Sequence, residues 1–153
     1  MLTNVLLFGA ILLAAHLYGG TLYAAYALRP VLRKLPSREG LNVHRLTTHR
    51  IERYMPQSGV GAGILAVAAL IADHDFDLAW WLIAAGFASQ VPVAFEAFLV
   101  NLPINRVWDT YSLDAIPEDE YQRLSARWDR FNAARLFGAF LAIGFYTAAA
   151  LAL

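Results

Sequence analysis

The sequence of 153 residues contains no cysteine and few charged residues. The absence of cysteine excludes disulfides, thiolate metal ligands, iron–sulfur ligation and a cysteine nucleophile. Charged residues make up 16% of the chain, below the roughly 25% that is usual for soluble domains. The 12 basic and 12 acidic residues balance, which leaves no overall positive charge for binding nucleic acid. With 59% hydrophobic residues and a mean hydropathy of +0.47, the sequence predicts an integral membrane protein.

Apolar segments follow one another along the whole chain, at residues 5–28, 57–72, 78–100 and 136–153. A helix needs about 20 apolar residues to cross the hydrocarbon core of a bilayer. The shorter second segment is rich in glycine and alanine, which allow close packing against a neighbouring helix. We therefore predict an all-α fold, a four-helix transmembrane bundle in up-down-up-down order, that forms a single integral membrane domain over residues 1–153.

All 12 Lys and Arg residues lie on one side of these segments. By the positive-inside rule, we expect both long loops to be cytoplasmic and both termini external, in the inner (plasma) membrane of a bacterium. No basic residue precedes Arg29 and the first apolar run is long, so we expect this segment to be retained rather than cleaved as a signal peptide. The basic residues are Arg29, Arg33, Lys34, Arg38, Arg45, Arg50 and Arg53, followed by Arg106, Arg123, Arg127, Arg130 and Arg135.

Local signals refine the third and fourth helices. Residues 116–120, Ile-Pro-Glu-Asp-Glu, are typical of a helix start because proline and acidic residues occupy the first turn. They predict a short cytoplasmic helix over 121–132 that extends the fourth span. Pro92 lacks a backbone donor and leaves the carbonyl of Ala88 without a partner, so we expect a kink in the third helix.

His16 lies midway along the first predicted span and shares one helical face with Gly20 and Tyr23, at positions i, i+4 and i+7. An ionisable group is costly in the hydrocarbon core. One interpretation makes His16 a catalytic proton acceptor or a haem or metal ligand, with Tyr23 as a substrate-binding residue. The other makes it a neutral imidazole that bonds an adjacent helix.

The first long loop carries a basic run from His44 to Arg53, which we interpret as a surface helix in contact with anionic lipid or an acidic partner. His44 and His49 are five residues apart, so they do not share one helical face as a metal pair requires. Because these two and His74 are assigned to loops, the sequence predicts no second intramembrane histidine and no metal site.

Glu96 is the one acidic residue inside a predicted span. A carboxylate there is either neutral or paired, and Arg135 of the fourth helix is the expected partner. Such a group could act as a general base. The structural alternative is an ion pair that holds two helices together.

Polar residues gather where the third helix ends and the fourth begins. Pro103 is predicted to force Leu102 out of helical geometry, so that Asn101 and Asn105 bond the freed backbone groups of a break. Trp128, Asn132 and Arg135 follow one another at i, i+4 and i+7 along the incoming fourth helix. These five polar residues form a predicted cluster at the cytoplasmic ends of the two helices.

These motifs resemble the anthrone oxygenase-like family of small four-helix membrane proteins. The resemblance is carried by residues 101–105 and 128–135, and by 17–23 and 28–32 at the first helix and the turn after it. It implies that the family's polar signature falls on Asn101, Asn105, Trp128, Asn132 and Arg135. Characterised relatives insert oxygen into anthrones to make anthraquinones without an evident metal or flavin, so no cofactor is expected.

Two functions are compatible with the sequence. The first is an oxygenase for a hydrophobic aromatic compound from the bilayer, in which Glu96 or His16 removes a proton and Asn and Arg side chains hold the resulting oxyanion. The second is a non-catalytic accessory subunit of a respiratory or photosynthetic membrane complex that binds lipid, quinone or pigment. Membrane lipids, a hydrophobic small molecule or a larger complex are the expected partners, and the chain could form a homo-oligomer.

Overall fold

The structure is a computed structural model that describes residues 1–51 and 54–153; Arg53, one of the basic residues of the first loop, lies outside the described part. The described elements are all helical, which confirms the predicted all-α fold. They are α1 (Leu2–Tyr23), the π-helical turn η1 (Ala24–Leu28), α2 (Arg29–Leu32), α3 (Ser37–Ile51), α4 (Met55–Ala72), α5 (Leu78–Glu96), the π-helical turn η2 (Ala97–Asn101), α6 (Leu102–Thr110) and α7 (Glu118–Ala152).

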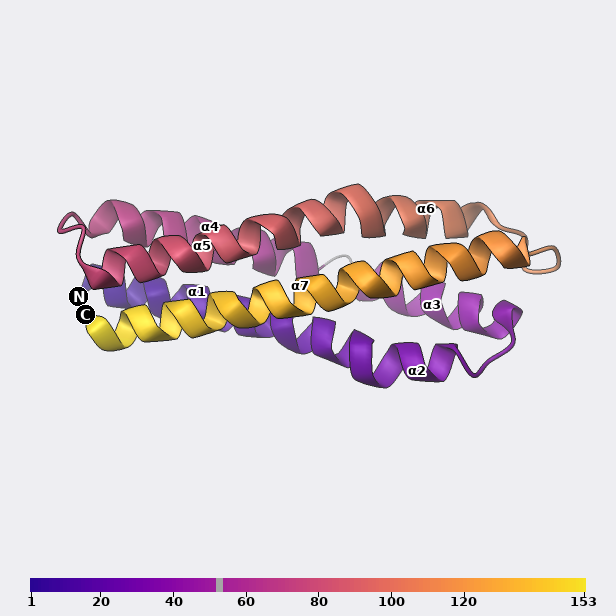
Figure 1. The fold of residues 1–153 in the computed structure, drawn as a ribbon. Coiled ribbons are helices and arrows are strands. Elements are labelled where there is room, and N and C mark those ends of the chain that lie inside the picture. Colours follow the sequence, from indigo (N-terminus) through magenta and orange to yellow (C-terminus); the bar gives the residue numbers. More distant parts are fainter. Residues whose placement is uncertain (52–53) are drawn as a thin grey trace.

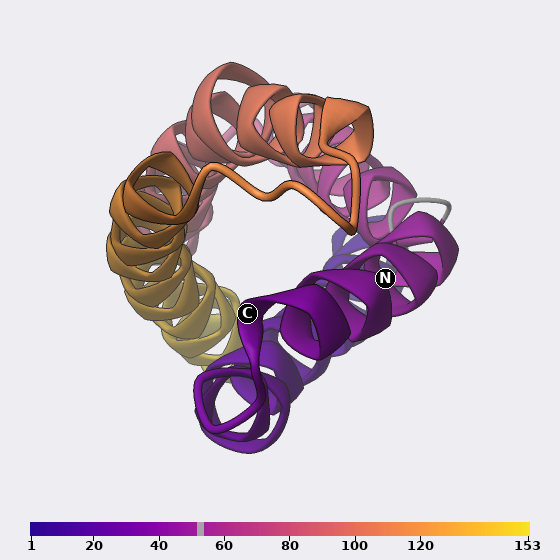
Figure 2. The same cartoon turned by 90° about the vertical axis from the view of Figure 1, so that its right-hand side faces the viewer.

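The long helices pack in a closed ring. Helix α1 contacts α4 and α7, and α5 contacts the same two helices; the end-on view in Figure 2 shows this arrangement. Figure 1 shows both termini and the α4–α5 connection at one end, with the α2–α3 and α6–α7 connections at the other. Four stretches are long and apolar enough to cross a membrane, as predicted: Leu2–Leu32, Ser37–Ala72, Leu78–Thr110 and Glu118–Ala152. The direction in which each crosses stays a prediction.

Small side chains let the helices approach closely in the half of the bundle near the termini. Its core is largely alanine, with the larger side chains of Leu7, Ile83 and Tyr146 filling the space between helices. The hydroxyl of Tyr146 donates a hydrogen bond of 2.7 Å to Oε1 of Gln90, which ties α7 to α5. This half matches the predicted transmembrane bundle, because lipid-facing bundles depend on close packing of small residues.

Helix α7 is much longer than a bilayer requires. Its 35 residues correspond to roughly 50 Å, against about 30 Å of hydrocarbon. It begins directly after Pro117 and has Glu118, Asp119 and Glu120 in its first turn, where acidic side chains complement the helix dipole. The predicted extension of the fourth span is therefore confirmed, and it forms one wall of a second, polar half of the molecule.

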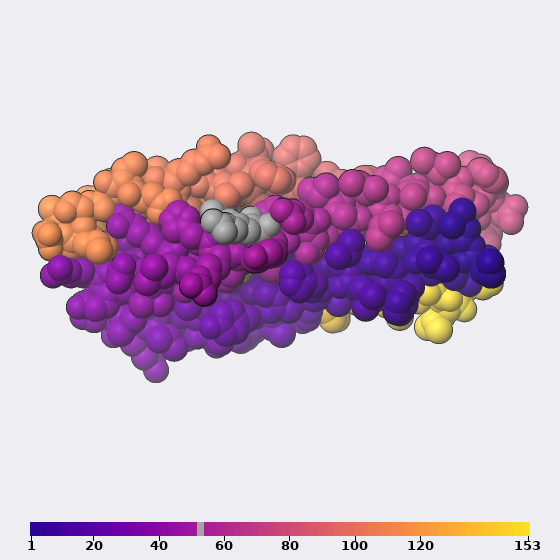
Figure 3. All heavy atoms as spheres, turned by 180° about the vertical axis from the view of Figure 1, so that it is seen from behind, coloured from indigo at the N-terminus to yellow at the C-terminus, as the bar shows by residue number. Residues whose placement is uncertain are grey.

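The second half is built by α2, α3, α6 and the first turns of α7. Helix α3 folds back along the bundle and buries Gly40, Leu41 and His44. Arg45 fixes it to the end of α6 by donating to the carbonyl oxygens of Trp108 and Tyr111. Figure 3 shows α2 and α3, in violet and magenta, lying against each other on this face. The α6–α7 connection crosses the end of the ring (Figure 2).

The predicted break around Pro103 is wrong. Leu102 has helical angles, φ −61° and ψ −45°, and the chain stays helical from α5 through η2 into α6. A π-helical turn precedes Pro103, and another precedes Pro30. Such a turn contains one extra residue, which accommodates a proline that has no amide hydrogen to donate and would crowd the preceding carbonyl. The helix therefore continues through the proline instead of ending at it.

Candidate functional site

A cavity of about 110 Å³ lies between the alanine-rich core and the polar half of the bundle. Both π-helical turns contribute to its wall, as do α1, α3, α4, α5, α6 and α7. Most of the wall is apolar. The polar side chains on it are those of Thr21, His44, Thr48, Gln90, Asn101, Asn105, Trp128, Asn132 and Arg135.

All five residues of the predicted polar cluster therefore lie on one cavity. Asn101 and Asn105 both face it because the helix continues through Pro103, which keeps residues i and i+4 on the same face. Asn101 is 3% exposed, and among the described residues neither its side-chain oxygen nor its nitrogen has a hydrogen-bond partner. A buried amide without partners is costly, so this side chain is suited to bind a polar group inside the cavity.

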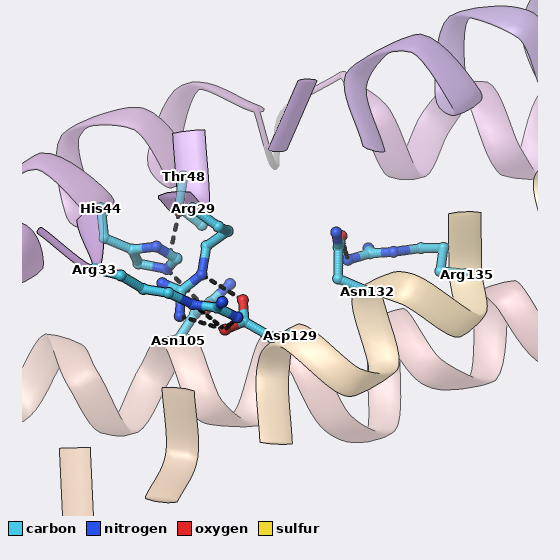
Figure 4. Close-up of polar contacts among 8 residues, drawn as sticks. All are labelled: Arg29, Arg33, His44, Thr48, Asn105, Asp129, Asn132 and Arg135. Atoms are coloured by element: carbon cyan, nitrogen blue, oxygen red, sulfur yellow. Dashed lines mark hydrogen bonds and ion pairs between the residues drawn. The ribbon is translucent and has the colours of Figure 1, made fainter. Parts of the chain in front are cut away.

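Arg135 brings a positive charge to the cavity wall. One of its terminal nitrogens donates a hydrogen bond of 2.9 Å to Oδ1 of Asn132 (Figure 4). Its guanidinium lies 6.0 Å from the ring centre of Trp128. Its Nε is buried and has no hydrogen-bond partner within residues 1–51 and 54–153. The side chain is thus oriented by two neighbours on its own helix and keeps a donor for a ligand.

A second arginine, Arg29, is buried in the polar half of the molecule and does not line the cavity. Arg29 is 3% exposed and pairs with Asp129, with Nε 2.5 Å from Oδ1 (Figure 4). Its guanidinium lies 5.2 Å from the ring centre of Trp128. Burial raises the pKa of the Asp129 carboxyl, but hydrogen bonds from Arg29 and Arg33 outweigh this effect and hold it below its usual value. This pair anchors α2 to α7.

His44 lines the cavity although sequence reasoning does not assign it to the site. The sequence places it in a loop, yet it lies on α3, is 2% exposed and contributes to the wall. Its Nε2 is 3.3 Å from Oδ1 of Asn105 and 3.1 Å from Oγ1 of Thr48 (Figure 4). Burial, and next the charge of Arg29, lowers the pKa of His44 to about 4, so the ring is neutral at physiological pH.

Glu96 does not line the cavity, although it belongs to the helix that forms one wall. It is close enough to Arg135 for an electrostatic interaction, but within the described residues no ion pair under 4.0 Å joins them. Its Oε2 is buried and has no hydrogen-bond partner in the part of the chain that the structure describes. The sequence correctly predicts that these two residues lie near each other. Arg135 lines the cavity, whereas Glu96 does not.

His16 and Tyr23 lie in a different place. Both border a shallow hollow on the outside of the bundle, between α1, α3 and the start of α4. Nδ1 of His16 is 2.8 Å from Oγ of Ser58 on α4. This contact matches the second interpretation from the sequence, in which the imidazole bonds an adjacent helix. Gly20, Ile51 and Met55 border both this hollow and the inner cavity, so a thin wall separates them.

Among the described residues, no group of three or more His, Cys, Asp or Glu side chains lies close enough together to hold a metal ion. The side chains on the cavity wall offer one guanidinium, several amides, one neutral imidazole and an apolar surface.

A family model described as anthrone oxygenase matches residues 45–145. This range covers most of the chain. The protein belongs to the anthrone oxygenase family. The match includes the polar cavity residues on η2, α6 and α7, and it begins one position after His44. Comparison with curated proteins gives no match, and comparison with solved structures gives none either.

Proposed function

We propose that the protein is an oxygenase that binds a hydrophobic aromatic ketone of the anthrone type and promotes its oxidation by dioxygen. The observation that carries this proposal is the composition of the cavity wall: one cationic side chain, Arg135, and the amide of Asn101 face a space whose wall is mostly apolar. The chemical character of this wall matches a planar apolar molecule that bears a carbonyl oxygen.

The chemistry requires stabilisation of an oxyanion. An anthrone has an acidic methylene carbon opposite its carbonyl group, and loss of a proton there delocalises negative charge onto the carbonyl oxygen. Nε of Arg135 and Nδ2 of Asn101, which have no hydrogen-bond partner among the residues described, are donors available for this charge. Donors held in a low-dielectric site lower the barrier without reorganising, typically by a factor of about 10²–10³ for each.

The position of the cavity suits a substrate that dissolves in lipid. It lies between helices whose outer surfaces carry exposed Leu, Val and Phe side chains, so a hydrophobic molecule could reach it from the bilayer. We place the protein in the inner membrane of a bacterium, with both termini external and both long loops cytoplasmic, on the strength of its basic residues.

The test is oxygen uptake by the protein in lipid nanodiscs with a hydroxylated anthrone, with formation of the anthraquinone followed by its absorption. Arg135→Met removes the charge and keeps the length of the side chain, and we expect kcat/KM to fall by roughly 10²–10³. Arg127→Met is the matched control, because Arg127 is exposed on the same helix and should stay within about twofold. Equal rates for the two variants would refute the role of Arg135.

Failure of the unmodified protein to consume oxygen with any anthrone, when it binds the corresponding anthraquinone, would contradict the oxygenase function. It would leave a binding protein for aromatic ketones, which is the property that an accessory subunit for a quinone or pigment requires.

A further inference from the structure

The cavity needs a group that accepts the substrate's proton, and neither acceptor considered from the sequence lines it. Glu96 lies beside the wall and His16 lies on the outside of the bundle. His44 does line the cavity, and it comes from α3, a helix that the polar signature of the sequence does not include. The family match assigns no role to it, since the matched range begins at Arg45.

Packing fixes the orientation of the His44 ring. Trp108 and Trp128 meet it edge-on, with ring centres 4.6 Å and 5.6 Å away and interplanar angles of 88° in both cases. Nε2 faces the amide oxygen of Asn105 at 3.3 Å. An amide oxygen accepts hydrogen bonds and cannot donate them, whereas the hydroxyl of Thr48, 3.1 Å from the same nitrogen, can do either. An imidazole hydrogen on Nε2 is therefore compatible with both contacts.

In this tautomer the other ring nitrogen is a free acceptor. Nδ1 of His44 is buried and has no hydrogen-bond partner in the described structure. With the hydrogen on Nε2, Nδ1 carries the lone pair. A buried lone pair without a donor is costly to keep, and a ligand that presents a hydrogen to it would remove that cost.

We propose that Nδ1 of His44 is the proton acceptor of the cavity. The proposal rests on the proposed oxygenase function and names the residue that starts its chemistry. The carbon–hydrogen bond of the methylene breaks, the proton moves to Nδ1, and the electron pair delocalises onto the carbonyl oxygen held by Arg135. Dioxygen is the oxidant, and it adds to the carbanion to form a carbon–oxygen bond.

The remaining steps return His44 to its starting state. The imidazolium gives its proton to the new peroxide and then accepts the second hydrogen of the same carbon. The oxygen–oxygen bond breaks as the new carbonyl forms, and the departing hydroxide takes the proton as water. One oxygen atom is thus retained in the quinone and the other leaves as water.

The electrostatic surroundings favour this role. Among the described residues, the charged or titratable groups that act on His44 are Arg29 of α2, Asp129 of α7 and His49 of α3. Burial, Arg29 and His49 lower the pKa of His44, whereas the hydrogen bond to Asn105 and the charge of Asp129 raise it. The lowering effects prevail, so the imidazole is neutral and able to accept a proton. An anion formed beside Nδ1 would stabilise the imidazolium and offset the effect of Arg29.

Exchange of the substrate methylene hydrogens with deuterated solvent, without oxygen and followed by NMR, measures the proton transfer alone. In His44→Gln we expect this exchange to fall by at least about 10²-fold, while binding of the anthraquinone, read from tryptophan quenching, stays within about threefold. The controls Glu96→Gln and His16→Gln test the acceptors considered from the sequence, and both should exchange within about threefold of the unmodified protein.

A second variant keeps the test valid if His44→Gln does not fold. Asn105→Asp leaves the ring in place and puts a carboxylate against Nε2, which raises the basicity of the imidazole. The neutral ring is the active form, so exchange by the unmodified protein should fall as the pH drops through about 4, the pKa of His44. In Asn105→Asp this decline should begin at least about one pH unit higher.

The outcomes separate the two proposals. Exchange that survives in His44→Gln, or that disappears in Glu96→Gln alone, would overturn the role of His44 and leave the oxygenase function standing. An unmodified protein that catalyses neither exchange nor oxygen uptake would remove both. If exchange begins to decline at the same low pH in Asn105→Asp as in the unmodified protein, that result would also contradict the assignment of His44 as the proton acceptor.

Discussion

The buried ion pair between Arg29 and Asp129 allows a sharp test of how the polar half is held together. The side chain of Arg29 is 4% exposed and that of Asp129 15%, whereas the pair between Arg38 and Asp114 has side chains that are 65% and 80% exposed. Removing one partner of a buried pair leaves an unpaired buried charge and typically costs about 3–5 kcal/mol. An exposed pair contributes at most about 1 kcal/mol.

Asp129→Asn and Asp114→Asn therefore make the same chemical change in opposite surroundings. For a chain of this length, each kcal/mol shifts the melting midpoint by about 2–4 °C. We expect Asp129→Asn to lower the midpoint by roughly 6–20 °C and Asp114→Asn by less than about 4 °C. Circular dichroism of the protein in detergent micelles measures both.

Removing both charges should be less harmful than removing one. The double variant Arg29→Met, Asp129→Leu leaves no unpaired charge, so we expect it to recover most of the loss caused by Asp129→Asn. Equal midpoints for Asp129→Asn and Asp114→Asn would refute the assignment of Arg29 as a buried charge that depends on its partner.

The same pair predicts sensitivity to acid. Hydrogen bonds from Arg29 and Arg33 hold the pKa of Asp129 below the usual value, so the carboxylate binds fewer protons in the folded state than in the unfolded state. This stabilisation is complete above the ordinary aspartate pKa of about 3.9 and is lost as the pH falls through the lower folded value. The stability difference between the unmodified protein and Asp129→Asn should therefore shrink below about pH 4.

Two further predictions concern packing and topology. A Cβ at Gly86 would lie 2.5 Å from a ring carbon of Tyr146, whereas one at Gly144 would meet nothing within 4 Å. We expect Gly86→Ala to destabilise the bundle by about 1–3 kcal/mol and Gly144→Ala to be neutral or slightly stabilising, measured by the same melting curves; equal effects would contradict the close approach of α5 and α7. Because the chain has no cysteine, Asp75→Cys and Asp119→Cys are clean topology probes: a membrane-impermeant maleimide should label the first and not the second in intact cells, and the reverse pattern would overturn the orientation.

The bundle was predictable from sequence because hydrophobic segment length and proline-marked helix starts are local properties. The start of α7 after Pro117 and its continuation into the last apolar segment needed no tertiary information. The polar cluster was predictable for a similar reason, since Trp128, Asn132 and Arg135 share a face of any helix. Asn101 and Asn105 were grouped correctly although the break expected between them is absent, because an uninterrupted helix also places i and i+4 together.

His44 could not be found in the same way, because its burial depends on α3 folding back against α6. Its partner Asn105 is 61 positions away in sequence. The surrounding run contains basic residues, which made a solvated surface helix the natural interpretation. A weak local signal was present: Gly40, Leu41 and His44 are spaced so that one face of the helix is free of charge.

The burial of Arg29 was not predicted from the sequence, and the reason connects Pro30 to the site. From Leu7 to Ala24, the buried positions of α1 recur every three or four residues, as a regular helix requires; the next buried residue is Arg29, five positions on. The π-helical turn between them supplies the extra residue and rotates the following side chains inward. The alternation of three and four residues leads to Leu28 as the next inward position, whereas the turn that precedes Pro30 brings Arg29 inward, beside Asp129 and within range of His44. The π-helical turn thus positions Arg29, whose charge adds to the larger effect of burial in lowering the pKa of His44, so a variant that restores a regular helix at Pro30 should alter the cavity without touching any residue on its wall.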